Sequence, residues 1–167
     1  MLTNINGNLY LYNNTALTSA NFPLLSNVDH YLLIEENLLL NTIDLSSLTQ
    51  VGSYLKIKDT NGLNLSLPNL STVGGAFTLY ENSLTNVELP TLTTINGAFS
   101  YQYNSNNTSL SVPNLVGTIT NLNLTHNTDL NTVSIPNVTA LNYIYLHNNS
   151  DLTNVDMPSL NTINSTI

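Results

Sequence analysis

The sequence predicts a mainly β solenoid with little or no helix, from two observations. The first is a fixed period, because all six prolines lie 22 or 23 residues from their neighbours except across one gap of 45, which is two units. The second is the alternation of apolar and polar residues in two short stretches of each unit, with no 3.6-residue spacing. A period of this size is typical of chains in which each unit stacks only on its neighbours. The prolines are Pro23, Pro68, Pro90, Pro113, Pro136 and Pro158.

The repeat covers the whole chain, so we expect one domain over residues 1–167. Its length is sufficient for a continuous core. The pattern gives seven full turns and a partial eighth. The turns start near Leu2, Leu25, Leu48, Leu70, Leu92, Leu115, Val138 and Leu160.

Each turn is expected to contain two strands, and therefore to build two sheets. In the turn that begins at Leu70, the first strand is Phe77-Thr-Leu79 and the second is Val87-Glu-Leu89. Glycines such as Gly74 precede the first strand, where a left-handed residue suits a sharp bend. Proline closes the second strand because it lacks an N–H for the ladder. The first inward position of the first strand predicts one buried column, made of Leu9, Leu32, Leu55, Phe77, Phe99, Leu122 and Ile144.

An asparagine follows the first strand in six of the seven turns. A buried asparagine at a solenoid corner can bond the backbone of its own and the next turn, satisfying groups that a tight corner leaves unpaired. The column is Asn14, Asn37, Thr60, Asn82, Asn104, Asn127 and Asn149, with threonine in the third turn.

The string Leu-x-Leu-x-x-Asn-x-x-Leu, at residues 9–17 and 122–130, resembles leucine-rich repeats. The longer form, Leu-x-x-Ile/Val-x-Gly-x-Leu-x-Leu followed by Leu-Pro-x-Leu, is similar to receptor-L-type repeats. Those occur in ectodomains of growth-factor receptors and in fungal cell-wall proteins. The resemblance implies a right-handed solenoid used for recognition or surface architecture, without catalysis, in an extracellular or cell-surface location.

Tyrosine is unevenly distributed between the two strands. Strand alternation turns seven of the nine tyrosines outward from the first strand, whereas the outward column of the second strand has none. Strand propensity alone explains such a face if tyrosines simply pair well with their neighbours. The asymmetry favours the other interpretation, a contact surface of rigid aromatic anchors around a saddle of small or polar residues. The candidate residues are Tyr10, Tyr12, Tyr31, Tyr54, Lys56, Lys58, Tyr80, Tyr143, Tyr145 and His147.

Metal and catalytic signals are weak. Glu36, Asp59 and Glu81 share a column, so weak calcium binding is one interpretation and a solvated corner beside the lysines is the other. His126 and His147 lie on adjacent turns but lack the further ligands that zinc requires. No Ser-His-Asp or paired-carboxylate set converges on a pocket. We therefore expect a protein that is not an enzyme and has no cofactor and no metal.

Composition limits the partners. The net charge is −8 with two lysines and no arginine, which disfavours nucleic acid and anionic membranes. Cysteine is absent, and the sequence contains neither a transmembrane run nor a cleavable signal. We expect a recognition or adhesion module for a protein or a glycan, or else a structural subunit that assembles with copies of itself through its ends or its aromatic face into filaments, tubes or layers. An ice-binding array needs a flat threonine column, which Val116 and Asn161 interrupt.

Overall fold

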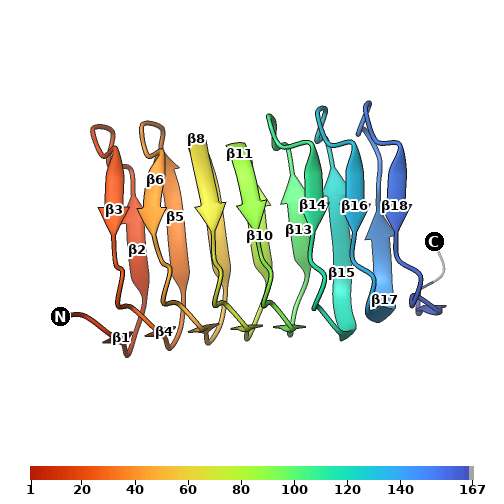
Figure 1. Ribbon diagram of the computed structural model, residues 1–167, viewed down its shortest axis with the longest axis horizontal. Helices are drawn as coiled ribbons and strands as arrows, with labels where there is room; N and C mark the ends of the chain where they lie inside the picture. The colour runs from red at the N-terminus through yellow and green to blue at the C-terminus, as the bar shows by residue number, and fades with distance from the viewer. Residues whose placement is uncertain (166–167) are drawn as a thin grey trace.

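The chain winds into a mainly β solenoid of about seven turns. The computed structural model describes residues 1–165, and no helix occurs among them. The two final residues of the expected domain, 166 and 167, lie outside the described residues. Successive turns lie side by side from the N-terminal to the C-terminal end (Figure 1). All paired strands are parallel, as when Phe77 pairs with Phe99 in the next turn.

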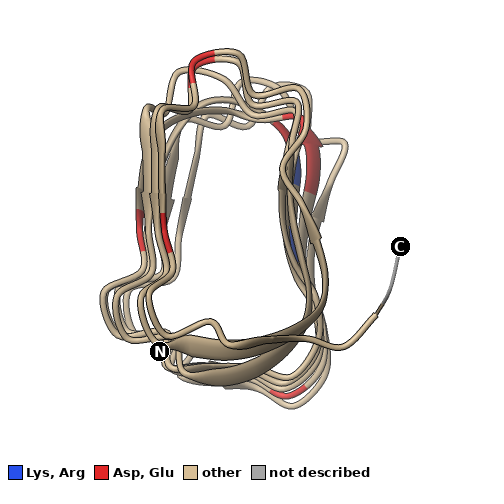
Figure 2. Cartoon of the chain, turned by 90° about the vertical axis from the view of Figure 1, so that its right-hand side faces the viewer, with Lys and Arg blue, Asp and Glu red and all other residues tan. Residues whose placement is uncertain are grey.

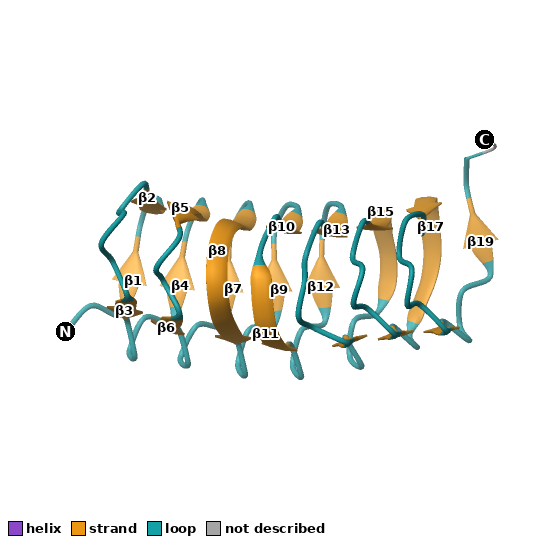
Figure 3. Cartoon of the chain, turned by 90° about the horizontal axis from the view of Figure 1, so that it is seen from above, coloured by secondary structure: helices purple, strands orange, loops and turns teal. Residues whose placement is uncertain are grey.

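Three sides, each a set of stacked parallel strands, build the wall. The first side consists of two-residue strands, which form one row along the solenoid (Figure 3): β1 (Asn4–Ile5), β4 (Asn27–Val28), β7 (Gln50–Val51), β9 (Thr72–Val73) and β12 (Thr94–Ile95). The second side contains β2 (Leu9–Tyr12), β5 (Leu32–Asn37), β8 (Leu55–Ser66), β10 (Phe77–Tyr80), β13 (Phe99–Gln102), β15 (Gly117–Thr125) and β17 (Val138–Tyr145), and β19 (Thr162–Ile163) pairs with the beginning of β17. The third side contains β3 (Ser19–Asn21), β6 (Thr42–Asp44), the end of β8, β11 (Ser83–Glu88), β14 (Ser109–Ser111), β16 (Thr132–Ser134) and β18 (Asn154–Asp156).

The expectation of two sheets was wrong, because the two-residue strands make a third side. These strands mostly precede the glycines. Each has a single inward apolar residue, such as Val28, Val51 or Val73, which is too short a pattern to show apolar–polar alternation. The inner strands β4, β7 and β9 nevertheless each pair in register with a neighbour on both sides. Viewed end on, the turns superimpose on one elongated outline (Figure 2).

The glycines before the first strand let the main chains of successive turns approach closely. The expectation that they have a left-handed backbone was wrong. Gly52 and Gly74 have no positive φ, but a Cβ atom on either would collide with a main-chain carbonyl oxygen of the preceding turn, that of Asp29 or Gly52 respectively. Among the described residues, the glycines with positive φ are Gly62 and Gly117, which lie elsewhere in the turn. A side chain at Gly52 or Gly74 would force neighbouring turns apart.

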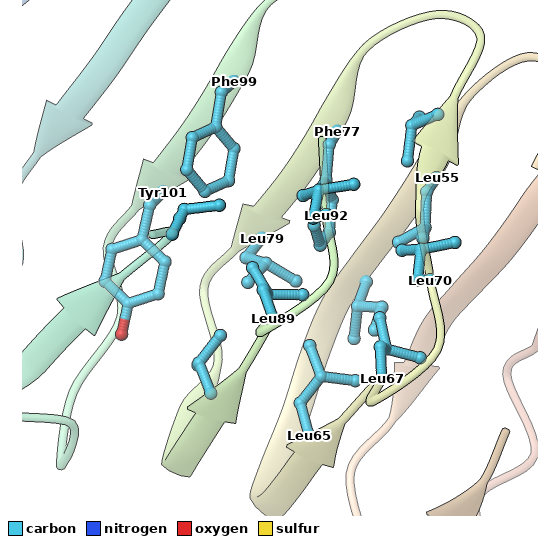
Figure 4. Close-up of a cluster of buried hydrophobic side chains, with 14 of the residues drawn as sticks. Leu55, Leu65, Leu67, Leu70, Phe77, Leu79, Leu89, Leu92, Phe99 and Tyr101 are labelled. Atoms are coloured by element: carbon cyan, nitrogen blue, oxygen red, sulfur yellow. The ribbon is translucent and has the colours of Figure 1, made fainter. Parts of the chain in front are cut away.

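The core runs along the whole solenoid as stacked apolar columns. Side chains from successive turns, among them Phe77, Phe99 and Tyr101, point into the interior (Figure 4). The rings of Phe77 and Phe99 lie 5.4 Å apart. The expected inward column is buried in its five middle turns, whereas Leu9 and Ile144 near the two ends are half-buried.

The asparagine column forms a continuous ladder of hydrogen bonds. In each asparagine from Asn37 onward, Nδ2 donates to a main-chain carbonyl of the preceding turn over 2.7–3.0 Å. Oδ1 accepts the main-chain N–H of the preceding column member over 2.9–3.1 Å. The side chains thus bond chiefly to the turn before them, where we had expected the turn after. Thr60 contributes a hydroxyl that donates to Asn82 Oδ1, but it has no amide with which to reach back.

The residue before each ladder position has a left-handed backbone. In all seven turns its φ lies between 51° and 60°. This conformation costs a non-glycine residue roughly 1–2 kcal/mol, and asparagine, aspartate and histidine adopt it most often. The sharp corner turns the following side chain inward, so the bonds of the ladder offset the strain. This corner column is Asn13, Glu36, Asp59, Glu81, Tyr103, His126 and Asn148.

We predict that Asn82→Leu lowers the free energy of unfolding by at least about 1–3 kcal/mol, because the Ile57 carbonyl and the Thr60 N–H lose a buried partner. Thr60→Asn should raise it by roughly 1 kcal/mol by completing the ladder. Urea denaturation measures both, with the exposed Asn64→Leu as the control that changes little. Equal unfolding midpoints for Asn82→Leu and the control would contradict a stabilising ladder.

Tyr101 makes stability sensitive to alkaline pH. Burial raises the pKa of its hydroxyl from 10.0 to about 12, with Nδ2 of Asn107 3.2 Å from its oxygen. The folded state therefore holds this proton longer than the unfolded state, so stability is intact below pH 10 and falls as the pH rises towards about 12. We expect this hydroxyl to contribute a loss of about 2–3 kcal/mol over that window, so stability should fall by that much less in Tyr101→Phe. Ionisation of all nine tyrosines in one step near pH 10 would contradict this prediction.

Candidate functional site

The outer face of the second side carries the candidate residues, and we call it the tyrosine face. Three outward columns form it, held in register by the parallel pairing of the strands. Five of its tyrosines, Tyr10, Tyr12, Tyr54, Tyr143 and Tyr145, are between 38% and 60% exposed. Tyr31, Tyr80, Lys56 and Lys58 are half-buried there, and His147 is exposed. The structure thus places all ten candidates on or beside one face, and their role in binding stays a prediction.

The two tyrosines outside the candidate set lie where the alternation puts them. Tyr101 replaces an inward leucine and is fully buried. Tyr103 stands at the corner with φ 54° and an exposed ring.

A hollow of about 280 Å³ opens on the N-terminal half of the tyrosine face. One wall is a parallel stack of Tyr31 on Tyr54, with ring centroids 5.5 Å apart. Ala76 and Thr78 lie on its C-terminal side. The lining is largely apolar, so the hollow suits the apolar part of a ligand.

Ion pairs neutralise both lysines. Lys56 Nζ lies 3.0 Å from Glu35 Oε1, and Lys58 Nζ lies 3.1 Å from Asp59 Oδ2 and 3.6 Å from Glu81 Oε2. The hydrogen bond to Asp59 is the main reason that the pKa of Lys58 is raised. The lysines lie on the wall formed by the second side (Figure 2). They hold carboxylates of the same chain, so a partner that pairs with either lysine has to displace these contacts.

The acidic corner has an internal explanation. Lys58 bridges two of the three stacked carboxylates, and the Tyr12 hydroxyl donates to the third, Glu36, over 3.3 Å. The nearby Glu36 charge raises the pKa of Tyr12. Within residues 1–165, no three His, Cys, Asp or Glu side chains gather closely enough to hold a metal ion.

A row of rings runs along the corner beside the tyrosine face. Tyr80 contacts Tyr103 at 5.3 Å, Tyr103 stacks on His126 at 4.2 Å, and His126 meets His147 edge-on at 5.3 Å. Lys58 lies 5.6 Å from the Tyr80 ring at the start of the row. Sequence spacing does not reveal this row, because its residues belong to two columns that meet only at the corner.

The middle of the tyrosine face is low and carries two unpaired amides. Ala98 and Ser100 continue the small residues of the hollow, and Asn121 and Asn123 follow in the next turn. Oδ1 of each asparagine is buried without a hydrogen-bond partner. Tyr143 and Tyr145, stacked at 6.0 Å, are the register partners of these two asparagines. Strand register therefore places small or polar residues between the two groups of tyrosines, as the sequence predicts.

The third side is chemically different. Its outward columns contain serine, threonine, asparagine, aspartate and glutamate, and no aromatic residue occurs in its strands. Hydroxyls and amides there bond locally, as when Ser66 donates to Glu88 over 2.7 Å. This polar side is the natural control for the tyrosine face.

Comparison of the chain with family models, curated proteins and solved structures finds no match. None of the described residues form a helix that is long and apolar enough to cross a membrane.

Proposed function

We propose that this protein is a non-enzymatic recognition or adhesion module that binds a protein or a glycan through its tyrosine face. The observation that carries the proposal is the confinement of exposed tyrosine rings to one side of a three-sided solenoid and the corner beside it. Strand propensity does not account for it, because the strands of the third side lack tyrosine altogether.

The physical chemistry of the face supports contact rather than catalysis. Tyrosine offers a large rigid area and a polar tip at a small cost in conformational entropy, and such residues dominate contact energies. The hollow beside Tyr54 gives an apolar anchor point, and the Lys56–Glu35 pair at its edge is already satisfied. A neutral, aromatic and shallow surface suits binding.

The proposal includes a right-handed solenoid of the leucine-rich-repeat type at the cell surface or outside the cell. The leucine and asparagine spacing supports the repeat type, and the strong preference of parallel β connections supports the hand. The location rests on the resemblance to receptor-L-type repeats.

Assembly with other copies of the chain is the alternative, favoured by one observation. The apolar columns are only half-buried near both ends of the described solenoid, where Leu9, Leu11, Leu146 and Met157 lie. Copies stacked end to end would bury them.

The test compares two triple variants. The wild-type chain is first screened against arrays of glycans and of secreted proteins to identify a ligand. We predict that the variant Tyr31→Ser/Tyr54→Ser/Tyr145→Ser no longer binds that ligand. Aromatic anchors contribute on the order of 2 kcal/mol each, so the affinity should fall by well over tenfold. The matched control, Asp44→Ser/Glu88→Ser/Asp156→Ser on the third side, should retain it.

Loss of binding in the control set alone would reverse the assignment, and loss in neither set would move the contact elsewhere. Sedimentation of the 18.2 kDa chain distinguishes the alternative, since large assemblies that survive the tyrosine substitutions indicate pairing through the ends.

A further inference from the structure

The low middle of the tyrosine face is bounded by aromatic rings at both ends. Its floor consists of Ala76, Thr78, Ala98 and Ser100 from β10 and β13 and the residues just before them. Tyr54 stands in the turn before the floor, and Tyr143 stands four turns after Tyr54 in the same column. Parallel strands lie about 4.8 Å apart, so the two rings are separated by about 19 Å along the solenoid. That length fits a short chain of several units.

The Tyr54 ring presents one free face towards this floor. Its other face is covered by Tyr31, whose ring is nearly parallel at 5°. The next residue in the column is Ala76, whose methyl group is too small to cover a phenol ring. The hollow of about 280 Å³ runs beside the Tyr31–Tyr54 stack and reaches the floor at Ala76 and Thr78, with the paired Glu35 and Lys56 on its wall. A supported ring with one open face is suited to a flat C–H surface.

At the other end of the floor, two hydrogen-bond acceptors lack donors. Oδ1 of Asn121 and Oδ1 of Asn123 are buried and unpaired, next to Tyr143 and Tyr145. A buried polar group without a partner costs about 1–3 kcal/mol, so each of these oxygens would gain from a donor brought by a ligand. The two side chains are two residues apart on one strand and therefore lie side by side across the solenoid axis, so a ligand that meets both must carry hydroxyl or amide donors across its width.

Charge and topology narrow the class of ligand. The floor and its aromatic ends carry no charge, and the nearest cation, Lys56, is paired with Glu35 at 3.0 Å. An extended peptide binds a sheet by pairing with an exposed strand edge, but β10 and β13 are already paired with neighbours on both sides. The ligand therefore contacts side chains only, through rings and amides.

We propose that this floor binds a short neutral oligosaccharide, with pyranose C–H faces against Tyr54 and Tyr143 and hydroxyls donating to Asn121 and Asn123. The assignment rests on the proposed function, since it names the ligand class of the tyrosine face. The tyrosine rings beside the two amides must rotate to admit the hydroxyls.

The experiment is a titration of the chain with three soluble neutral hexasaccharides, of β-1,4-linked glucose, β-1,3-linked glucose and β-1,4-linked N-acetylglucosamine. Tyrosine fluorescence reports binding, because the chain has nine tyrosines and no tryptophan. We expect at least one to bind with a dissociation constant of about 1 mM or tighter. Asn121→Leu/Asn123→Leu should weaken that binding about tenfold, as should Tyr143→Ala, while Asn64→Leu on the third side leaves it unchanged.

The asparagine double variant also has a second readout. The leucine side chain has nearly the same shape as that of asparagine, and the double substitution removes both unpaired oxygens. The melting temperature of the double variant should therefore equal or exceed that of the wild type, while its affinity for the sugar falls. Weakened binding together with a lower melting temperature would indicate a structural role and overturn the assignment. Binding that both the asparagine and Tyr143 variants retain would place the sugar elsewhere and overturn it as well.

Absence of binding to all three hexasaccharides also overturns it. In that case the array comparison decides the rest. If the wild type binds a protein on the array and the tyrosine triple variant does not, the tyrosine face is still the recognition surface and its partner is a protein. If the triple variant loses nothing, the proposed function fails too.

Discussion

Hydrogen bonds from the asparagine column hold each turn to the one before it. Every full rung joins a side-chain amide to a main-chain carbonyl and a main-chain N–H at a corner where strand pairing ends. The column is buried in its middle turns, so each bond satisfies groups that water does not reach. The residue before each rung has a strained, left-handed backbone, and the hydrogen bonds of the rung offset the cost of that strain.

The ladder also determines what the outside of the solenoid presents. Each asparagine fixes the corner and thereby fixes which residues of the preceding strand point inward. Before Asn37, a slip of one residue would turn Tyr31 inward and Leu32 outward. The glycines at the opposite end of such strands let successive turns approach closely. Outward columns are therefore straight rows along the second side, and rings, ion pairs and amides meet their counterparts one turn away. The proposed binding face depends on that alignment.

Much of this arrangement follows from the sequence, and the exceptions have physical reasons. The period, the inward columns, the asparagine ladder and the outward tyrosines are readable because each repeats as a residue type. The first side was missed because a strand with one buried residue, such as Val51, shows no alternation. The left-handed corner was missed because its column carries Glu36, Tyr103 and His126 where glycine would have been the signal. The unpaired amides of Asn121 and Asn123 depend on side-chain packing, which no spacing encodes.

Hydrogen exchange at the corner tests the central claim most directly. The main-chain N–H groups of Thr60, Asn82, Asn104 and Asn127 each donate to an asparagine Oδ1 of the following turn. If the ladder holds the turns together, these four amides exchange as slowly as those of the buried strands, through global unfolding. Exchange at the rate of exposed turns, such as the segment around Leu38 and Leu39, would mean that the ladder does not hold the solenoid together.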